Sequence, residues 1–264
     1  MIFIVLSGLA GLALMVATVY TCKRFRSEWQ MPRGLYLKAG MALLALEFFH
    51  FAMMDGVIAM WPEFMNMNLL LQAGILGIGA GIFFEFGRFM FLDKFFRGVR
   101  LEKEGLYFAL GWNGVATFLI GLLVFLGTVG LYVLVNTDDL SSFFNTDDEK
   151  EMEQVVQMQE EAQTMIKDYP LLGFSPIIER GSILVLDMAL TLLILLYFMG
   201  SSSVVVWQAA GIRAVATAGI FAAQRVDLYL GALMYIVVGL ISFLILRKVR
   251  AHFDGSYSLK INGT

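Results

Sequence analysis

Ionisable side chains that could do chemistry lie inside stretches that are otherwise apolar. Glu85 and Arg88 are three residues apart in a run of Ala, Gly, Ile, Leu and Phe, and Glu47 and His50 have the same spacing in an earlier run. Residues three apart share one face of a helix. A charge in hydrocarbon costs about 2.5–3.5 kcal/mol on insertion scales, so these groups are expected to have a partner and a purpose.

Two kinds of catalysis would use such groups. Converging Glu, His and Asp side chains can hold a metal such as zinc, which activates water at an open position. Glu47 and Glu85 could instead act as paired carboxylates in acid–base chemistry. His50 is the only histidine in an apolar stretch, which weakens the zinc hypothesis. The candidate catalytic residues of an active enzyme are Glu47, His50, Glu85, Arg88 and Asp187.

The competing interpretation is structural, with ion pairs and hydrogen bonds between helices. The short turn at 201–203 makes the apolar stretches on its two sides antiparallel neighbours. Asp187 and Arg213 lie at similar distances from this turn, so they can meet and offset each other's desolvation. By helical rise, Glu85 and Asn113 are expected nearer the cytoplasmic face than this pair. The intramembrane polar residues assigned to structure are Glu85, Arg88, Asn113, Asp187 and Arg213.

The elements that must position these groups are membrane-spanning helices. Hydrophobic residues make up 59% of the chain and charged residues 16%, whereas soluble domains have about 25% charged residues. Stretches of about 20 apolar residues cross a bilayer as helices, and the alternating pattern of a barrel is missing. We therefore predict an all-α, polytopic transmembrane bundle in a single membrane domain, 1–264. Its seven spans lie near 2–21, 38–61, 68–92, 105–135, 178–200, 203–223 and 227–246.

Basic residues set the expected orientation. Lys and Arg cluster at 23–38, 94–103 and 247–250, which fall on one side of a seven-span chain. Because cytoplasmic loops are rich in Lys and Arg, the N-terminus is expected outside and the C-terminus in the cytoplasm, in a bacterial cytoplasmic membrane. The clusters lie at span ends and anchor the topology, so no nucleic-acid partner is expected.

The stretch 136–177 is predicted to be an acidic extracytoplasmic loop. Val155, Met158, Ala162 and Met165 recur in it at helical spacing, which predicts an amphipathic helix. This helix is either a lid on the bundle or a docking surface for a partner.

Glycines on the third span predict close helix packing. Gly77 and Gly81 form a GxxxG pair. Small residues let membrane helices approach closely. We expect this face to pack within the bundle rather than against a second copy.

Three segments together resemble one family of membrane proteins. The run Gly81–Phe89 resembles the EExxR stretch of YhfC-type intramembrane metallopeptidases, which are grouped with CAAX-processing proteases, PrsW and the multispan scaffold subunit of gamma-secretase. The segment Ala109–Ala116 resembles the GxGHGGxE stretch of that family. The pair at 179–180, eight residues before Asp187, resembles the ER-to-histidine spacing of the next motif, and Arg213 lies where a further histidine is expected.

Several positions that carry acids and histidines in the family hold other residues here. The resemblance implies that those groups activate water in the family, with or without a metal, and a metal site needs several ligands in a fixed geometry. Of that set only Glu85 and Arg88 survive. The resemblance therefore implies a pseudoprotease. The substituted positions are Phe84, Trp112, Ala116, Asp187 and Arg213.

The sequence thus favours a non-catalytic scaffold or anchor subunit that resembles an inactive intramembrane metallopeptidase. It would contact the lipid bilayer, organise or regulate other membrane proteins, and need no cofactor. One alternative is an active intramembrane peptidase that uses Glu47 and Glu85, and zinc would be needed only in that case. The other is a small transporter or channel with a charged interior. Against transport, the sequence has no clear internal repeat and its prolines lie in loops or at span ends.

Overall fold

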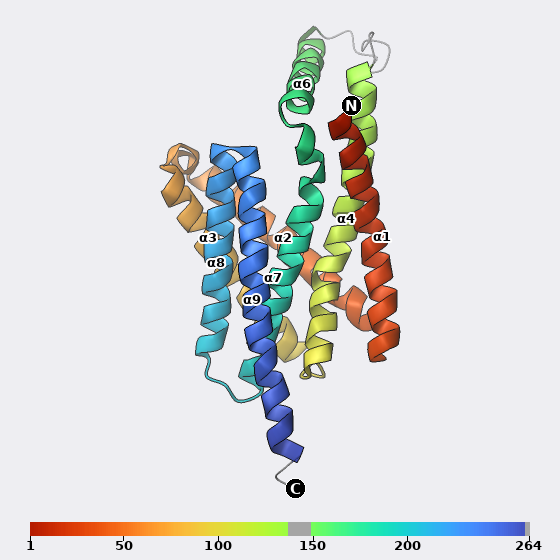
Figure 1. The fold of residues 1–264 in the computed structure, drawn as a ribbon. Helices are drawn as coiled ribbons and strands as arrows, with labels where there is room; N and C mark the ends of the chain where they lie inside the picture. The colour runs from red at the N-terminus through yellow and green to blue at the C-terminus, as the bar shows by residue number, and fades with distance from the viewer. Residues whose placement is uncertain (137–148, 262–264) are drawn as a thin grey trace. The chain divides into compact units, whose positions relative to one another are not determined.

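A computed structural model describes residues 1–136 and 149–261. Every regular element in this part of the chain is helical, which confirms the predicted fold class (Figure 1). The elements are α1 (Ile2–Trp29), α2 (Arg33–Met60), η1 (Pro62–Asn66), α3 (Leu69–Lys94), α4 (Glu102–Asn136), α6 (Glu149–Asp168), η2 (Pro170–Phe174), α7 (Ser175–Phe198), α8 (Val204–Val226) and α9 (Leu228–Ile261).

Seven helices of the described chain are long and apolar enough to cross a membrane. They are α1, α2, α3, α4, α7 with the preceding η2, α8 and α9, so the prediction of seven spans is confirmed. The protein is therefore an integral, multi-pass membrane protein. The orientation of its two ends stays a prediction.

Contacts divide the chain into two compact units, and the single domain 1–264 stays a prediction. The first unit comprises Met1–Ala17 and Thr117–Ile177. Within it, α6 falls in the predicted acidic loop, and Gln159 Nε2 donates to the Leu134 carbonyl over 2.9 Å. Four acidic residues of that loop lie outside the described residues, namely Asp138, Asp139, Asp147 and Asp148.

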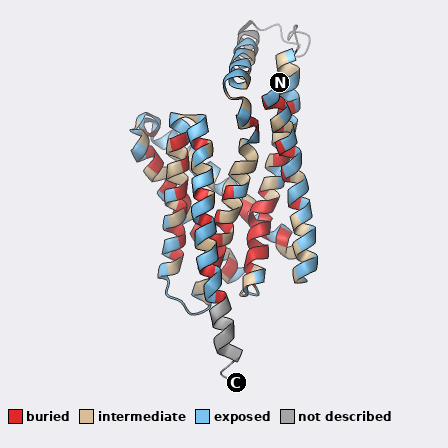
Figure 2. Ribbon diagram, in the orientation of Figure 1, coloured by how far each residue is buried: buried red, intermediate tan, exposed pale blue. Residues whose placement is uncertain are grey.

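The second unit, Thr18–Ala116 with Ile178–Thr264, contains the polar groups of interest. Its core includes the stretch 189–195 of α7 and the stretch 105–114 of α4, in which every residue is buried (Figure 2). A glycine at 111 is needed here, because a Cβ at this position would lie 2.7 Å from the Cα of Tyr36. The first turn of α2 therefore packs directly on the backbone of α4.

Helices α3 and α8 meet through small residues. Gly77 faces Ala214 and Ala218, and Gly81 faces Ala210 and Ala214. A Cβ at Gly81 would lie 2.9 Å from the Cβ of Ala214, closer than side chains approach each other. The GxxxG face thus packs inside this unit, as the sequence predicts, and it brings polar groups on α3 and α8 within reach of each other.

The loop between α3 and α4 is held by Arg100. Its Nη1 donates to the carbonyl oxygens of Leu92, Phe96 and Val99, over 3.3, 3.3 and 2.7 Å. Its guanidinium also lies 4.1 Å from the ring centroid of Phe198 on α7. Arg100 therefore closes the C-terminus of α3, where unpaired carbonyls favour a cation. Sequence reasoning had assigned it only to topology.

Candidate functional site

Five polar side chains from four helices meet inside the second unit. Glu85 and Arg88 come from α3, Asn113 from α4, Asp187 from α7 and Arg213 from α8. All five are buried, and Glu85 and Arg88 have no exposed surface at all. We call these five residues the charge cluster.

Asp187 is the acceptor at the centre of the charge cluster. Its Oδ1 pairs with Arg88 Nη2 and with Arg213 Nη2. Its Oδ2 accepts a hydrogen bond of 2.6 Å from Asn113 Nδ2, and its backbone carbonyl accepts from Arg88 Nη1 over 3.3 Å. Asp187 therefore joins α7 to α3, α4 and α8.

Glu85 connects the same two arginines from the opposite side. Its Oε2 lies 3.1 Å from Arg88 Nη1, in an ion pair without hydrogen-bond geometry. Its Oε1 accepts a hydrogen bond of 3.0 Å from Arg213 Nε. Each arginine thus contacts both acids, and the four charges balance. Balance matters because an unpaired buried charge loses its hydration without compensation.

Trp112 completes the surroundings of Arg88. The guanidinium carbon of Arg88 lies 5.2 Å from the Trp112 ring centroid, a cation–π distance, and Trp112 is fully buried. Sequence reasoning treated Trp112 only as a missing histidine. Its position beside Asn113 in a glycine-rich run is the signal that would have placed it near the polar groups.

Two of the predicted candidates lie outside the charge cluster. The His50 ring packs 5.5 Å from the ring of Phe83 and 5.0 Å from that of Phe84. Glu47 is half-buried and has no hydrogen bond or ion pair among the described residues, although it interacts electrostatically with Arg180, Asp187 and Arg213. Neither Glu47 nor His50 therefore contacts Glu85 directly in the described structure, and a catalytic role for these residues stays a prediction.

The structure brings together polar groups for which the sequence predicts two depths. The sequence placed Glu85 and Asn113 nearer the cytoplasmic face than Asp187 and Arg213, whereas direct side-chain contacts join all four, and their depth in a bilayer stays a prediction. Counting residues from the span ends assumes parallel, unshifted helices. The close contact of α3 with α8 sets their relative shift instead.

These features define a class of protein: a polytopic helical membrane protein with a neutral, buried charge cluster. The chain belongs to the YhfC intramembrane metalloprotease family, whose model matches residues 39–217, more than half of the sequence. This match confirms the resemblance and includes the whole charge cluster. No curated protein and no solved structure matches the chain.

The family description implies a metal, and the residues at the charge cluster do not fit one. Three of the four carboxylate oxygens of Glu85 and Asp187 accept hydrogen bonds from nitrogen donors, and the fourth, Glu85 Oε2, lies 3.1 Å from Arg88 Nη1 in an ion pair without a hydrogen bond. A divalent cation among them would also be repelled by Arg88 and Arg213. Across the described residues, no group of three His, Cys, Asp or Glu side chains could hold a metal ion.

Proposed function

We propose that this protein is a non-catalytic scaffold or anchor subunit that organises or regulates other membrane proteins. The observation that supports this best is Arg213, which contacts both acids of the charge cluster. The sequence resemblance implies a histidine at this position of the family pattern. A ligand of a metal would have to be neutral or anionic. An arginine at this position instead supplies the positive charge itself.

The two buried acids are also poorly placed to act on water. A general base must be within hydrogen-bond reach of the proton that it takes. Here the oxygens of Glu85 and Asp187 are directed at two guanidinium groups and an amide. A proton on either acid would leave Arg88 and Arg213 with one counter-charge between them. The arrangement therefore favours a structural cross-link over hydrolysis.

The test compares partners recovered with the full-length protein from native membranes. The wild type is set beside Glu47→Gln and the double variant Glu85→Gln/Arg88→Gln, which keeps the charge cluster neutral. A scaffold should hold the same partners, at the same length, in all three cases. The length of each partner is also compared in cells with and without the protein.

Enzymatic activity gives a different result. A partner that is shortened only in the presence of the wild type, and stays intact with Glu47→Gln or the double variant, would show that the protein is a peptidase. Stoichiometric zinc in the purified wild type would also overturn the proposal. The scaffold role would also be contradicted if no partner co-purified with the protein in an equimolar amount.

A further inference from the structure

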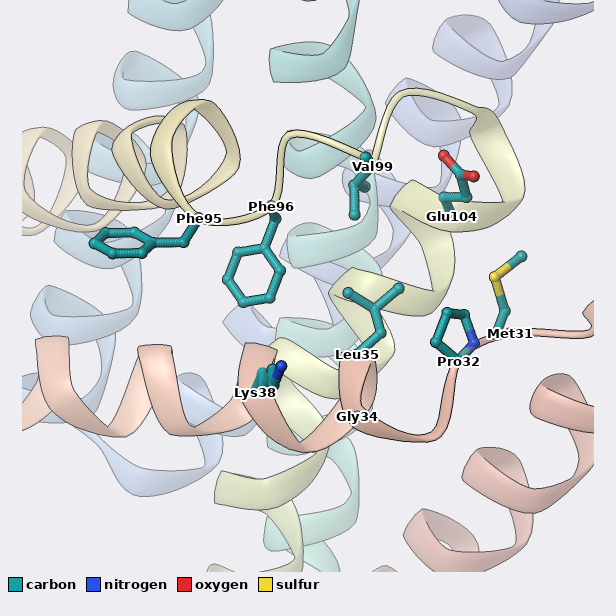
Figure 3. A pocket seen from close by; sticks show the side chains of 10 residues that line it. Met31, Pro32, Gly34, Leu35, Lys38, Phe95, Phe96, Val99 and Glu104 are labelled. Carbon is teal, nitrogen blue, oxygen red and sulfur yellow. The ribbon is translucent and has the colours of Figure 1, made fainter.

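A cavity of about 400 Å³ lies where α2 begins, α3 ends and α4 begins. Figure 3 shows Leu35 rising from α2 toward Phe96 and Val99 of the loop between α3 and α4. Lys38 lines the cavity one turn after Leu35, and Glu104 lines it from α4. All of these residues belong to the second unit.

The cavity lies at the level where three membrane spans end. The spans concerned are bounded by Gly34, Lys94 and Glu102 at this end. Its apolar wall is part of the folded core, because Phe96 packs against Phe108 with ring centroids 5.1 Å apart. A site at this depth meets both the polar headgroups and the first part of the acyl chains of a bilayer.

Lys38 gives the cavity a cation without a partner. Lys38 is exposed and makes no ion pair among the described residues. Two basic residues at the end of α3 do have partners: Lys94 pairs with Asp93 over 3.0 Å, and Arg100 donates to carbonyls of α3. The Glu104 carboxylate is turned to the backbone, where its Oε2 accepts from the amides of Arg100 and Leu101 over 2.8 and 3.0 Å.

Two more cavities of this unit also have basic side chains in their walls, but each is lined by one stretch of chain at a single helix. One, of about 350 Å³, is lined by Arg247 and Arg250 beside Phe243, and the other, of about 440 Å³, by Lys23 and Arg26. Both lie in the basic clusters that the sequence places at this end of the spans. The cavity at Lys38 is lined by three separate segments of the chain, and basic pockets between membrane helices bind anionic lipid headgroups.

We propose that the cavity at Lys38 binds a phospholipid with an anionic headgroup. The lipid phosphate would lie at the Lys38 ammonium, and one acyl chain would follow Leu35 and Phe96. The apolar wall is the reason to prefer a lipid to a free phosphate ion. This site is independent of the proposed scaffold role.

The test uses the full-length protein in phosphatidylcholine vesicles that contain a little spin-labelled phosphatidylglycerol. Electron paramagnetic resonance then measures the preference of the protein for the anionic lipid. Lys38→Gln should lower this preference about fivefold, whereas Lys38→Arg should keep it. Gly98→Trp should lower it too, because Gly98 lines the cavity and has no atom within 4 Å of an added Cβ.

Two matched controls separate a site from general attraction. Lys103→Gln removes a charge from the same end without touching the cavity, and Gly74→Trp adds the same bulk to an open position on α3. Neither should change the preference. An equal loss with Lys103→Gln, no preference for phosphatidylglycerol in the wild type, or full displacement by inorganic phosphate would each overturn the proposal. Thermal unfolding of every variant shows whether it is folded before its binding is compared.

Discussion

The Nε atom of Arg213 on α8 lies 3.0 Å from Oε1 of Glu85 on α3. Together with the ion pair between Arg88 and Asp187, this contact joins two pairs that the chain forms separately. Glu85 and Arg88 are neighbours on one helix, and Asp187 and Arg213 face each other across a short turn. With both contacts in place the four charges form one neutral group, whose stability should depend on its total charge.

Charge balance at the charge cluster gives the first prediction. Asp187→Asn leaves two arginines with one carboxylate and should lower the free energy of unfolding by about 3–5 kcal/mol. Asp187→Asn with Arg213→Gln leaves the Glu85–Arg88 pair intact, so this double variant should lose less than the sum of the single losses. Asp187→Asn with Glu85→Gln leaves two uncompensated arginines and should lose the most.

Unfolding by a denaturing detergent, followed by circular dichroism, measures these differences. The two double variants change the same number of side chains and differ in the net charge that they leave in the cluster. If they were equally stable, charge balance would not govern the cluster.

A second prediction concerns the approach of α3 to α8. Gly81→Ala would push a Cβ against the backbone oxygen of Ala210 and should cost about 1–3 kcal/mol, as overpacking usually does. Gly79→Ala is the matched control on the same helix, because no atom lies within 4 Å of the added Cβ. Its melting temperature should equal that of the wild type or exceed it slightly. Equal melting of the two variants would argue against the close contact.

The third prediction is that lysine cannot replace Arg100. Burial lowers the pKa of the Arg100 guanidinium, and the carboxylates of Asp93 and Glu104 oppose this shift. A lysine has no planar fork to reach several carbonyls and stack on Phe198, so Arg100→Lys should lose about 1.5–3 kcal/mol of stability.

Arg97→Lys serves as its control. The Arg97 side chain is exposed and makes one hydrogen bond, from Nε to the Asp93 carbonyl over 3.1 Å. Its replacement should change the stability by less than about 0.5 kcal/mol. A stable Arg100→Lys variant would mean that charge alone, rather than the guanidinium geometry, closes α3.

Topology can be tested by labelling single cysteines from outside the cell. In a Cys22→Ser background, Glu160→Cys on α6 should react with a membrane-impermeant maleimide, and His252→Cys on α9 should not. Both residues are exposed in the structure. The reverse pattern would invert the protein in the membrane. Labelling of both sites would contradict an odd number of spans.

The membrane spans are readable from the sequence because lipid demands long apolar runs. The ends of the helices are harder to predict from the sequence. Helix α1 continues to Trp29, beyond the apolar run that ends near residue 21. A helix hydrogen-bonds its own backbone in hydrocarbon and in the interface alike. Because basic side chains such as Lys23 and Arg26 can extend toward the headgroups, the helix can continue beyond the apolar run.

The charge cluster was predictable only in part. The turn at 201–203 indicates that Asp187 and Arg213 are neighbours, since few arrangements are open to a short hairpin. Nothing of that kind links Glu85 to Arg213, which are 128 residues apart in the chain. Their contact depends on which helix covers the glycines of α3. The glycine spacing indicates a close approach, but small residues on several helices could satisfy it.

The pairing of the four charges also has a consequence for membrane insertion. Glu85 and Arg88 enter the bilayer on one helix, one turn apart, with their charges already opposed. Asp187 and Arg213 enter on the two arms of the α7–α8 hairpin. The buried part of α3 and that of the α7–α8 hairpin are thus each neutral. Neither segment therefore has to place an unpaired charge in lipid before the two segments meet. The contacts of Arg213 with Glu85 and of Arg88 with Asp187 can form last, when the inserted α3 and the inserted α7–α8 hairpin come together side by side in the bilayer.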